Sequence, residues 1–274
     1  MDARQEIFPA RRTWPPAIDN LNGVSGDTTE VRLVSGAKNL QMLNSFARLK
    51  ALWCFDINDE ALDSICNCAS LESLFIENLK TGNVGRLGRL RKLSTLSLEC
   101  CSKISSLEFL VRLPALSGLA ITNFKNIHDL SPLTAMTSLR FLAVAGSTWT
   151  RMKVESLAPL GHLENLEFLH LPNIKAYDES LKPLATLQKL KILDIANFYP
   201  MMEFAELATT LRATECTWLQ PFLAMQKIMS CKKCKKHTMV MLTGKRKPNL
   251  CTVCDAAALE QHVKDWDHSI VQRS

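Results

Sequence analysis

The chain has 274 residues, and its 33 Lys and Arg outnumber its 27 Asp and Glu, which gives a formal net charge of +6. Hydrophobic residues make up 47% and charged residues 22%, which is ordinary for a folded protein and excludes a wholly disordered chain. The charge is uneven, because residues 221–254 hold eight Lys or Arg and no Asp or Glu, so the rest of the chain carries a net charge of −2. The length fits one elongated domain or one to two compact ones.

The N-terminal residues contain no apolar run that could act as a secretion signal. No stretch of the sequence reaches the roughly 20 apolar residues that cross a bilayer. We therefore expect a cytoplasmic protein that does not insert into a membrane. In that compartment, the ten Cys are expected to be reduced thiols or metal ligands rather than disulfides.

Leucine is concentrated in one region, since 31 of the 42 Leu lie between Leu49 and Leu193. They form seven lines, each 22 to 27 residues from the next, in which positions 1, 4 and 6 are Leu, Ile or Val except for Cys54 in the first line. The lines begin at Leu49, Leu71, Leu93, Leu116, Leu139, Leu166 and Leu190. The alternation predicts a short strand with one buried face in each line. A single repeat cannot bury that face, so the repeats must stack.

The return half of each line has apolar residues three apart, as in Leu157, Leu160 and Leu163, a spacing that fits 3₁₀ turns or short helices on a convex side. This pattern resembles the leucine-rich repeat family, which implies an α/β solenoid: a horseshoe with short parallel strands inside. The run from Asp129 to Leu139 resembles the bacterial internalin-like or phosphatase-regulator-like subclass.

The lines depart from the family pattern at one place. The family carries Asn at position 9, whose amide bonds to backbone in the next turn, whereas here position 9 is mostly apolar. Position 8 instead carries Asp56, Asn78, Asn123, Asn173 and Asn197. Two explanations remain open at this point: the polar ladder has moved by one residue, or the turn has a different geometry.

The sequence divides into four segments. Residues 1–27, which contain Trp14, are expected to form a loose arm or a cap, and residues 28–212 the solenoid, with seven regular repeats from 49 and a degenerate first one. Residues 213–230 are expected to form a closing cap or linker, and residues 231–274 a zinc ribbon followed by a helix.

The strongest chemical signal is a pair of CxxC motifs, Cys231/Cys234 and Cys251/Cys254, separated by sixteen residues. Two such knuckles can complete a four-thiolate shell around one metal ion, and the strand-like run between them resembles a zinc ribbon. We therefore expect one structural zinc per chain. The alternatives are four reduced thiols, or an iron–sulfur or redox site.

Two features surround the cysteines. Leu259, Val263, Trp266 and Ile270 form an apolar stripe at helical spacing, expected to pack on the ribbon or the last repeat, or else to bind a partner. A basic cluster suggests contact with nucleic acid, although surface Lys beside zinc thiolates is the simpler interpretation and no aromatic residue interleaves it. The cluster comprises Lys227, Lys232, Lys233, Lys235, Lys236, Lys245, Arg246 and Lys247.

Positions 3, 5 and 7 of each line are expected to face the concave side. Aromatic residues gather at both ends of that face, and exposed aromatics on a rigid sheet favour a protein-binding groove. The alternative is that the N-terminal arm, through Trp14, or a second copy covers the Trp53 end. The candidate partner-binding residues are Trp53, Phe55, Phe75, Glu77, Glu99, Phe141, Phe168 and His170.

No phosphate-binding Gly loop and no Ser/His/Asp set is found, and four ligands leave a zinc ion no open catalytic position. The sequence therefore predicts a non-enzymatic scaffold that binds a protein partner and no small-molecule substrate. Two other functions remain open: a nucleic-acid-associated factor that uses the basic ribbon, and a substrate-receptor subunit of an enzyme complex.

Overall fold

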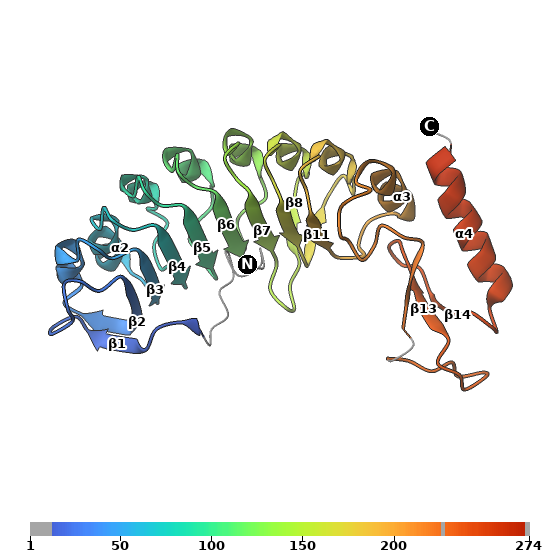
Figure 1. The fold of residues 1–274 in the computed structure, drawn as a ribbon, viewed down its shortest axis with the longest axis horizontal. Coiled ribbons are helices and arrows are strands. Elements are labelled where there is room, and N and C mark those ends of the chain that lie inside the picture. The colour runs from blue at the N-terminus through green and yellow to red at the C-terminus, as the bar shows by residue number, and fades with distance from the viewer. Residues whose placement is uncertain (1–12, 226–227, 272–274) are drawn as a thin grey trace.

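A computed structural model describes residues 13–225 and 228–271 of the chain. Three parts of the predicted organisation lie outside these residues: 1–12 of the N-terminal arm, Lys227 of the basic cluster, and 272–274 at the C-terminus. The described chain forms an arch, with strands on its inner side and helical turns on its outer side (Figure 1).

The inner side is a nine-stranded parallel sheet, in which each strand pairs with the next one along the arch. Its strands, in spatial order, are β1 (Ala17–Asn20), β2 (Glu30–Lys38), β3 (Ala51–Phe55), β4 (Ser73–Glu77), β5 (Thr95–Glu99), β6 (Gly118–Thr122), β7 (Phe141–Ala145), β9 (Phe168–Leu171) and β11 (Ile192–Ile195). Seven of these are the seven predicted lines, and β2 is the degenerate first repeat. β1 adds a further strand from the segment that was expected to be an arm or a cap.

The outer side is made mostly of 3₁₀ turns, as the three-residue spacing predicts. They are η2 (Leu40–Ser45), η3 (Gly85–Arg89), η4 (Glu108–Arg112), η5 (Ser131–Ala135), η6 (Ala158–His162) and η7 (Lys182–Thr186), with α2 (Asp59–Cys66) and α3 (Met201–Thr210) as full helices. The Pro residues of the return segments stand at the first turns of η5, η6 and η7, where no backbone N–H is needed. The longest repeat, which begins at Leu139, carries an extra strand, β8 (Met152–Val154), and it pairs in parallel with β10 (Ile174–Ala176) of the next repeat to form a second small sheet.

The hydrophobic core runs without a break along the arch, between the sheet on the inner side and the turns on the outer side. The aliphatic side chains of positions 1, 4 and 6 fill it; those of Leu93, Leu96 and Leu98, for example, have no exposed surface. Each repeat thus buries its apolar face only against its neighbours, which makes the two ends of the arch the places that need a cap.

The polar ladder has indeed moved to position 8, and the turn geometry explains why. Five of the seven residues at this position adopt a left-handed backbone, with φ of 62° at Asn78 and 58° at both Cys100 and Asn123, for example. Asn tolerates that conformation better than most residues. The amide of Asn78 donates to Asp56 Oδ1 one repeat earlier, and that of Asn123 donates to Cys100 Sγ at 3.1 Å. The ladder therefore joins one repeat to the next through side chains.

Replacing Asn78 with alanine should lower the free energy of unfolding by about 1–3 kcal/mol, because it removes a part-buried hydrogen bond and strains the left-handed backbone. Asn78→Gly removes the bond alone and should cost about half as much. Urea unfolding of both variants measures the difference. Asn83→Ala, at an exposed position of the same repeat, should stay within about 0.5 kcal/mol of the parent chain; equal losses at Asn78 and Asn83 would contradict the ladder.

The C-terminal part consists of a three-stranded antiparallel sheet and a helix. Its strands are β12 (Phe222–Ala224), β13 (Met239–Leu242) and β14 (Asn249–Cys251), followed by α4 (Ala256–Val271). The predicted hairpin between the CxxC motifs corresponds to β13 and β14. The sequence missed β12, which comes from the segment expected to be a linker. None of the helices in the described part of the chain has the length and hydropathy of a transmembrane helix.

Candidate metal centre and concave face

The two CxxC motifs meet at one end of the small sheet. Cys251 is the last residue of β14 and pairs with Met239, the first residue of β13. Cys231 lies in the turn that precedes β13, where its carbonyl accepts from Lys235 N at 2.9 Å and its N–H donates to Lys236 O at 2.8 Å. Lys235 has a φ of 63°, so the turn closes tightly enough to bring both cysteines of the first motif to one side. Strand pairing then sets the second motif opposite the first.

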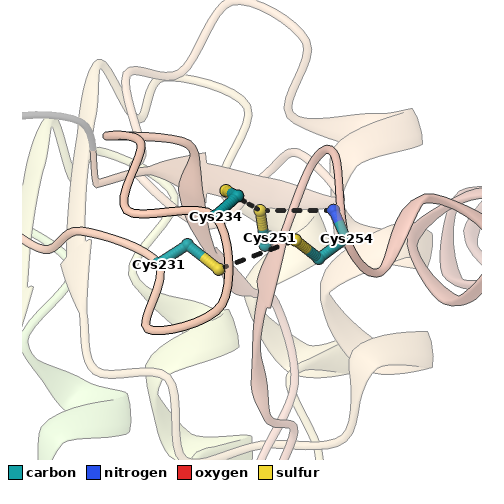
Figure 2. Close-up of side chains that lie close together, drawn as sticks. All are labelled: Cys231, Cys234, Cys251 and Cys254. Carbon is teal, nitrogen blue, oxygen red and sulfur yellow. Dashed lines mark hydrogen bonds between the residues drawn. The ribbon is translucent and has the colours of Figure 1, made fainter.

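The four sulfur atoms lie within 4.8 Å of one another, and their side chains converge from two loops (Figure 2). Sγ of Cys231 is 3.9 Å from that of Cys254, and Sγ of Cys234 is 3.8 Å from that of Cys251. Ligand bonds of about 2.3 Å in a tetrahedral zinc site place neighbouring sulfurs about 3.8 Å apart, whereas a disulfide would hold them about 2 Å apart. The cluster therefore has the dimensions of a four-thiolate metal site, and all four residues are free cysteines.

Hydrogen bonds favour ionisation inside the cluster. The N–H of Cys254, at 3.4 Å, and the hydroxyl of Thr238, at 3.0 Å, point to Cys251 Sγ and lower the pKa of that thiol to about 6. The pKa of Cys254 is raised to about 12, because the other thiols crowd it, Cys234 most strongly. The sulfurs cannot all be thiolates side by side without a cation between them. A divalent metal ion would supply the missing charge.

The environment of the cluster is polar and partly basic. Lys233 forms an ion pair with Asp255 at 3.0 Å, and Asp255 Oδ2 accepts from Cys251 N at 3.0 Å. These two bonds hold the pKa of Asp255 below its usual range, with the backbone bond as the larger cause. His237 is exposed, and its Nδ1 lies 3.3 Å from Ser230 Oγ. It does not belong to the four-residue cluster.

The small sheet is attached to the last repeat of the solenoid. Asn197, the position-8 residue of the last line, donates from Nδ2 to Leu242 O at 2.9 Å and accepts at Oδ1 from Gly244 N at 2.7 Å. Lys245 N donates to Tyr199 O at 2.8 Å. The polar ladder thus ends on the ribbon hairpin, where another repeat would otherwise follow.

The same hairpin is fixed by charge and by close packing. Lys245 Nζ forms an ion pair with Glu179, which also pairs with Lys175 at 3.1 Å. Gly244 has a φ of 114°, and a Cβ there would lie 2.8 Å from that of Met201. A side chain at position 244 would therefore push the ribbon away from α3.

Helix α4 completes the attachment. Trp266 is 4% exposed and belongs to the core of the solenoid, with Ile270 packed against it. His262 is also buried, and its Nε2 lies 2.8 Å from Pro221 O, at the start of the small sheet. The stripe was expected to pack on the ribbon or on the last repeat, and its C-terminal half, Trp266 and Ile270, packs against the core of the solenoid. The burial of His262 was not predicted, because no pattern in the sequence marks this residue.

At the N-terminal end of the concave face, Trp14 covers the aromatic cluster. Its ring centroid lies 6.2 Å from that of Trp53 and 6.0 Å from that of Phe55, while Trp53 stacks on Phe75 at 5.2 Å. The guanidinium carbon of Arg32 lies 5.3 Å from the Trp14 ring. Trp53 is therefore buried, contrary to the prediction that it is exposed. Of the two alternatives considered from the sequence, the covering by Trp14 is the one found.

The aromatics further along the face are buried as well. Phe141 and Phe168 are 5% and 1% exposed, and they pack with Ala120 and Ala143 in a small cluster of their own. The prediction that these rings are exposed was wrong, because they pack against the small residues that were expected to form an open floor. Phe55 and Phe75 remain partly exposed.

Polar residues make up much of the accessible part of the face. Glu77 and Glu99 are register partners on β4 and β5, so two carboxylates stand opposite each other on adjacent strands. His170 on β9 has Nδ1 2.8 Å from Asp194 Oδ2 on β11. All four side chains point to the concave side by strand alternation, as predicted for three of them.

Two solved bacterial structures share this architecture. An internalin from Listeria monocytogenes has a TM-score of 0.56 at 17% identity, over 69% of this chain and 60% of its own. A leucine-rich-repeat protein from Leptospira interrogans has a TM-score of 0.54 at 17% identity, over 73% of this chain and 52% of its own. The chain thus spans less than two thirds of the length of either protein.

A third structure, internalin C2 from L. monocytogenes, has a TM-score of 0.49 at 23% identity, over 63% of this chain and 71% of its own. No protein-family model matches the chain. No curated protein sequence matches it either. The two structural matches and the parallel sheet with its 3₁₀ turns agree on one conclusion: the chain has the leucine-rich-repeat solenoid fold.

Proposed function

We propose that the protein is a non-enzymatic scaffold whose concave face binds a protein partner, and whose C-terminal ribbon holds one structural zinc ion. The observation that carries the first part is the pair of opposed carboxylates, Glu77 and Glu99, in the middle of a rigid sheet. Lys or Arg side chains of a basic partner segment could reach both carboxylates at once and form charge-assisted hydrogen bonds with them.

The zinc assignment rests on the donor set. Four soft thiolate ligands at tetrahedral spacing suit zinc, and they leave it no open position for a substrate or a water molecule. The ribbon also lies beyond the last repeat, where the core needs a cap. We therefore assign the metal a structural role, in which it holds the cap together. The proposal keeps the end of the solenoid at residue 212 and the start of the cysteine ribbon at residue 231, with β12 (Phe222–Ala224) of the intervening segment added to the ribbon sheet.

Glu77→Gln together with Glu99→Gln should weaken capture of the partner at least tenfold, equivalent to about 1.4 kcal/mol, while the fold is unchanged or slightly stabilised. The measurement uses a photo-crosslinking amino acid at Ser97, which is two residues before Glu99 on β5 and on the same face, followed by mass spectrometry of the captured proteins. The captured partner is then titrated against the parent chain and the double variant.

The matched control places the crosslinker at Glu108, an exposed residue of η4 on the convex side. The proposal expects one protein to be captured at Ser97 and not at Glu108, through a segment rich in Lys or Arg. Equal capture at both positions, or equal affinity of the double variant, would show that the concave face is not the binding surface.

The alternative, contact with nucleic acid through the ribbon, has less support. Lys233 and Lys245 are engaged in ion pairs. Among the other basic residues, Lys232, Lys235 and Lys236 flank the first knuckle, whereas Arg246 and Lys247 lie in the turn at the far end of β13 and β14. These five basic residues form two separate groups and not one continuous track that could follow a nucleic-acid backbone. Salt-sensitive binding of a polynucleotide, lost on substitution of these residues, would favour the alternative.

A further inference from the structure

A basic cleft lies on the convex side, between the outer turns of successive repeats. It has a volume of about 580 Å³ and includes four arginines from η3, η4 and the loop that connects η3 to β5. A single carboxylate, that of Asp63, is among the lining residues, which are Asp63, Asn83, Gly85, Arg86, Gly88, Arg89, Arg91 and Arg112. The cleft is therefore lined by more positive than negative charge.

Two glycines give the cleft its floor. A Cβ at Gly88 would lie 2.7 Å from Cβ and 3.1 Å from Cδ of Arg112, and one at Gly85 would lie 3.7 Å from Arg112 Nη1. The side chain of Arg112 therefore lies across η3 of the preceding repeat, where any larger residue would displace it. This packing places Arg112, although it is exposed, in the same cleft as Arg86 and Arg89.

Two of the arginines are fixed in place by α2. Arg86 donates from Nη1 to Asp59 O and from Nη2 to Asp59 Oδ2, both at 2.9 Å, and its side chain is only 15% exposed. Arg89 donates from Nη1 to Asp63 Oδ1 at 2.9 Å and to Asn67 Oδ1 at 3.2 Å. These two guanidiniums are thus oriented before any ligand arrives, which reduces the entropy lost on binding.

The other two arginines carry charge that the fold does not neutralise. Within residues 13–225 and 228–271, Arg91 and Arg112 form no ion pair, and Arg91 Nη1 donates to the carbonyl of Arg112 at 3.4 Å. Each guanidinium has five N–H donors in a planar fork that matches the oxygens of a phosphate. The cleft therefore combines fixed donors with uncompensated positive charge.

We propose that this cleft binds a ligand that carries clustered phosphate groups. Phosphate fits better than a carboxylate, because its oxygens can accept paired N–H groups from several arginines at once. No aromatic side chain lines the cleft, so recognition of a nucleobase by stacking is not expected. The arginines of the cleft come from η3, η4 and the loop after η3, and the helical turns lie on the outer side of the arch while the strands form its inner side (Figure 1), so this inference is independent of the proposed scaffold function.

Isothermal titration with inorganic tripolyphosphate, at low ionic strength, tests the proposal. The parent chain should show saturable binding, and Arg91→Gln with Arg112→Gln should weaken it at least tenfold. The matched control, Lys232→Gln with Lys236→Gln, removes the same charge from the ribbon and should leave the affinity within about twofold. Circular dichroism of both variants establishes that they are folded.

A phosphoserine peptide, titrated in parallel, distinguishes a phosphate carried by a protein from a free polyphosphate. Binding of either probe that depends on Arg91 and Arg112 supports the proposal. Absence of saturable binding by both probes would overturn it, and so would equal weakening by the arginine and lysine variants, because that result would show a general attraction to positive charge. Neither result would bear on partner capture at Ser97, so the two proposals fail separately.

Discussion

Cys251→Ser should abolish metal binding and release the C-terminal cap from the solenoid. Cys251 is fully buried, accepts the hydrogen bonds of Cys254 N and Thr238, and ends the strand that joins the two cysteine motifs. Small zinc modules derive about 10 kcal/mol or more of apparent folding free energy from the metal at pH 7. The ribbon has few buried side chains of its own, so we expect it to unfold when the site is lost.

The consequence should extend into the last repeats. Asn197 and Tyr199 would lose the hairpin to which they are hydrogen-bonded, and Trp266 would lose part of the support for its helix. Each repeat of a solenoid is stabilised by its contacts with the neighbouring repeats, so exposure of one end should destabilise the repeats next to that end first. The melting temperature should fall by about 5–10 °C, which corresponds to a few kcal/mol for a chain of this size.

Metal analysis, thermal unfolding and hydrogen exchange measure these effects. The parent chain should contain one zinc per chain, and the variant none, with faster exchange in β11 and α3 than in β4. Treatment with a strong chelator should reproduce the variant. Cys100→Ser, a half-buried thiol in a solenoid turn, should retain the metal and the melting temperature. Zinc retained by Cys251→Ser, or an unchanged solenoid after zinc loss, would contradict the linkage between metal and cap.

The solenoid could be predicted because the same apolar pattern recurs in every repeat. Leu, Ile and Val at positions 1, 4 and 6 can be buried only by stacking, and the seven lines became seven strands in register. The shift of the ladder to position 8 was also visible in the sequence. The cause of this shift was not visible in the sequence, because the left-handed backbone at Asn78 depends on the turn in which it lies.

The metal cluster could be predicted for a different reason. Cys231 and Cys234 are close in sequence, as are Cys251 and Cys254, so only one long-range contact had to be inferred. The concave face required many such contacts, and there the prediction was partly wrong. Strand alternation gives the direction of Phe141 and Phe168, but the space beside them depends on Ala120 and Ala143 in neighbouring repeats.

Trp266→Ala should lower the free energy of unfolding by about 3–5 kcal/mol, among the largest losses for any single side chain of the cap. The indole is 4% exposed and lies in the continuous core at the end of the solenoid, where no further repeat could close over a cavity. Denaturant unfolding, with tryptophan-independent circular dichroism as the signal, measures the loss. The same substitution at Trp149, which is 93% exposed in the loop before β8, should change stability by less than about 0.5 kcal/mol.

The small sheet and α4 both lie at the C-terminal end of the solenoid, and the zinc content of Trp266→Ala separates their contributions. Zinc content should be unchanged in Trp266→Ala, because the four cysteines contact the small sheet and one another rather than the indole. Loss of stability with full zinc content would show that the helix seals the core independently of the metal. Loss of both together would mean that the sheet and α4 form one cooperative unit, held to the solenoid by Asn197 on one side and Trp266 on the other. Unchanged stability would mean that α4 is not the cap.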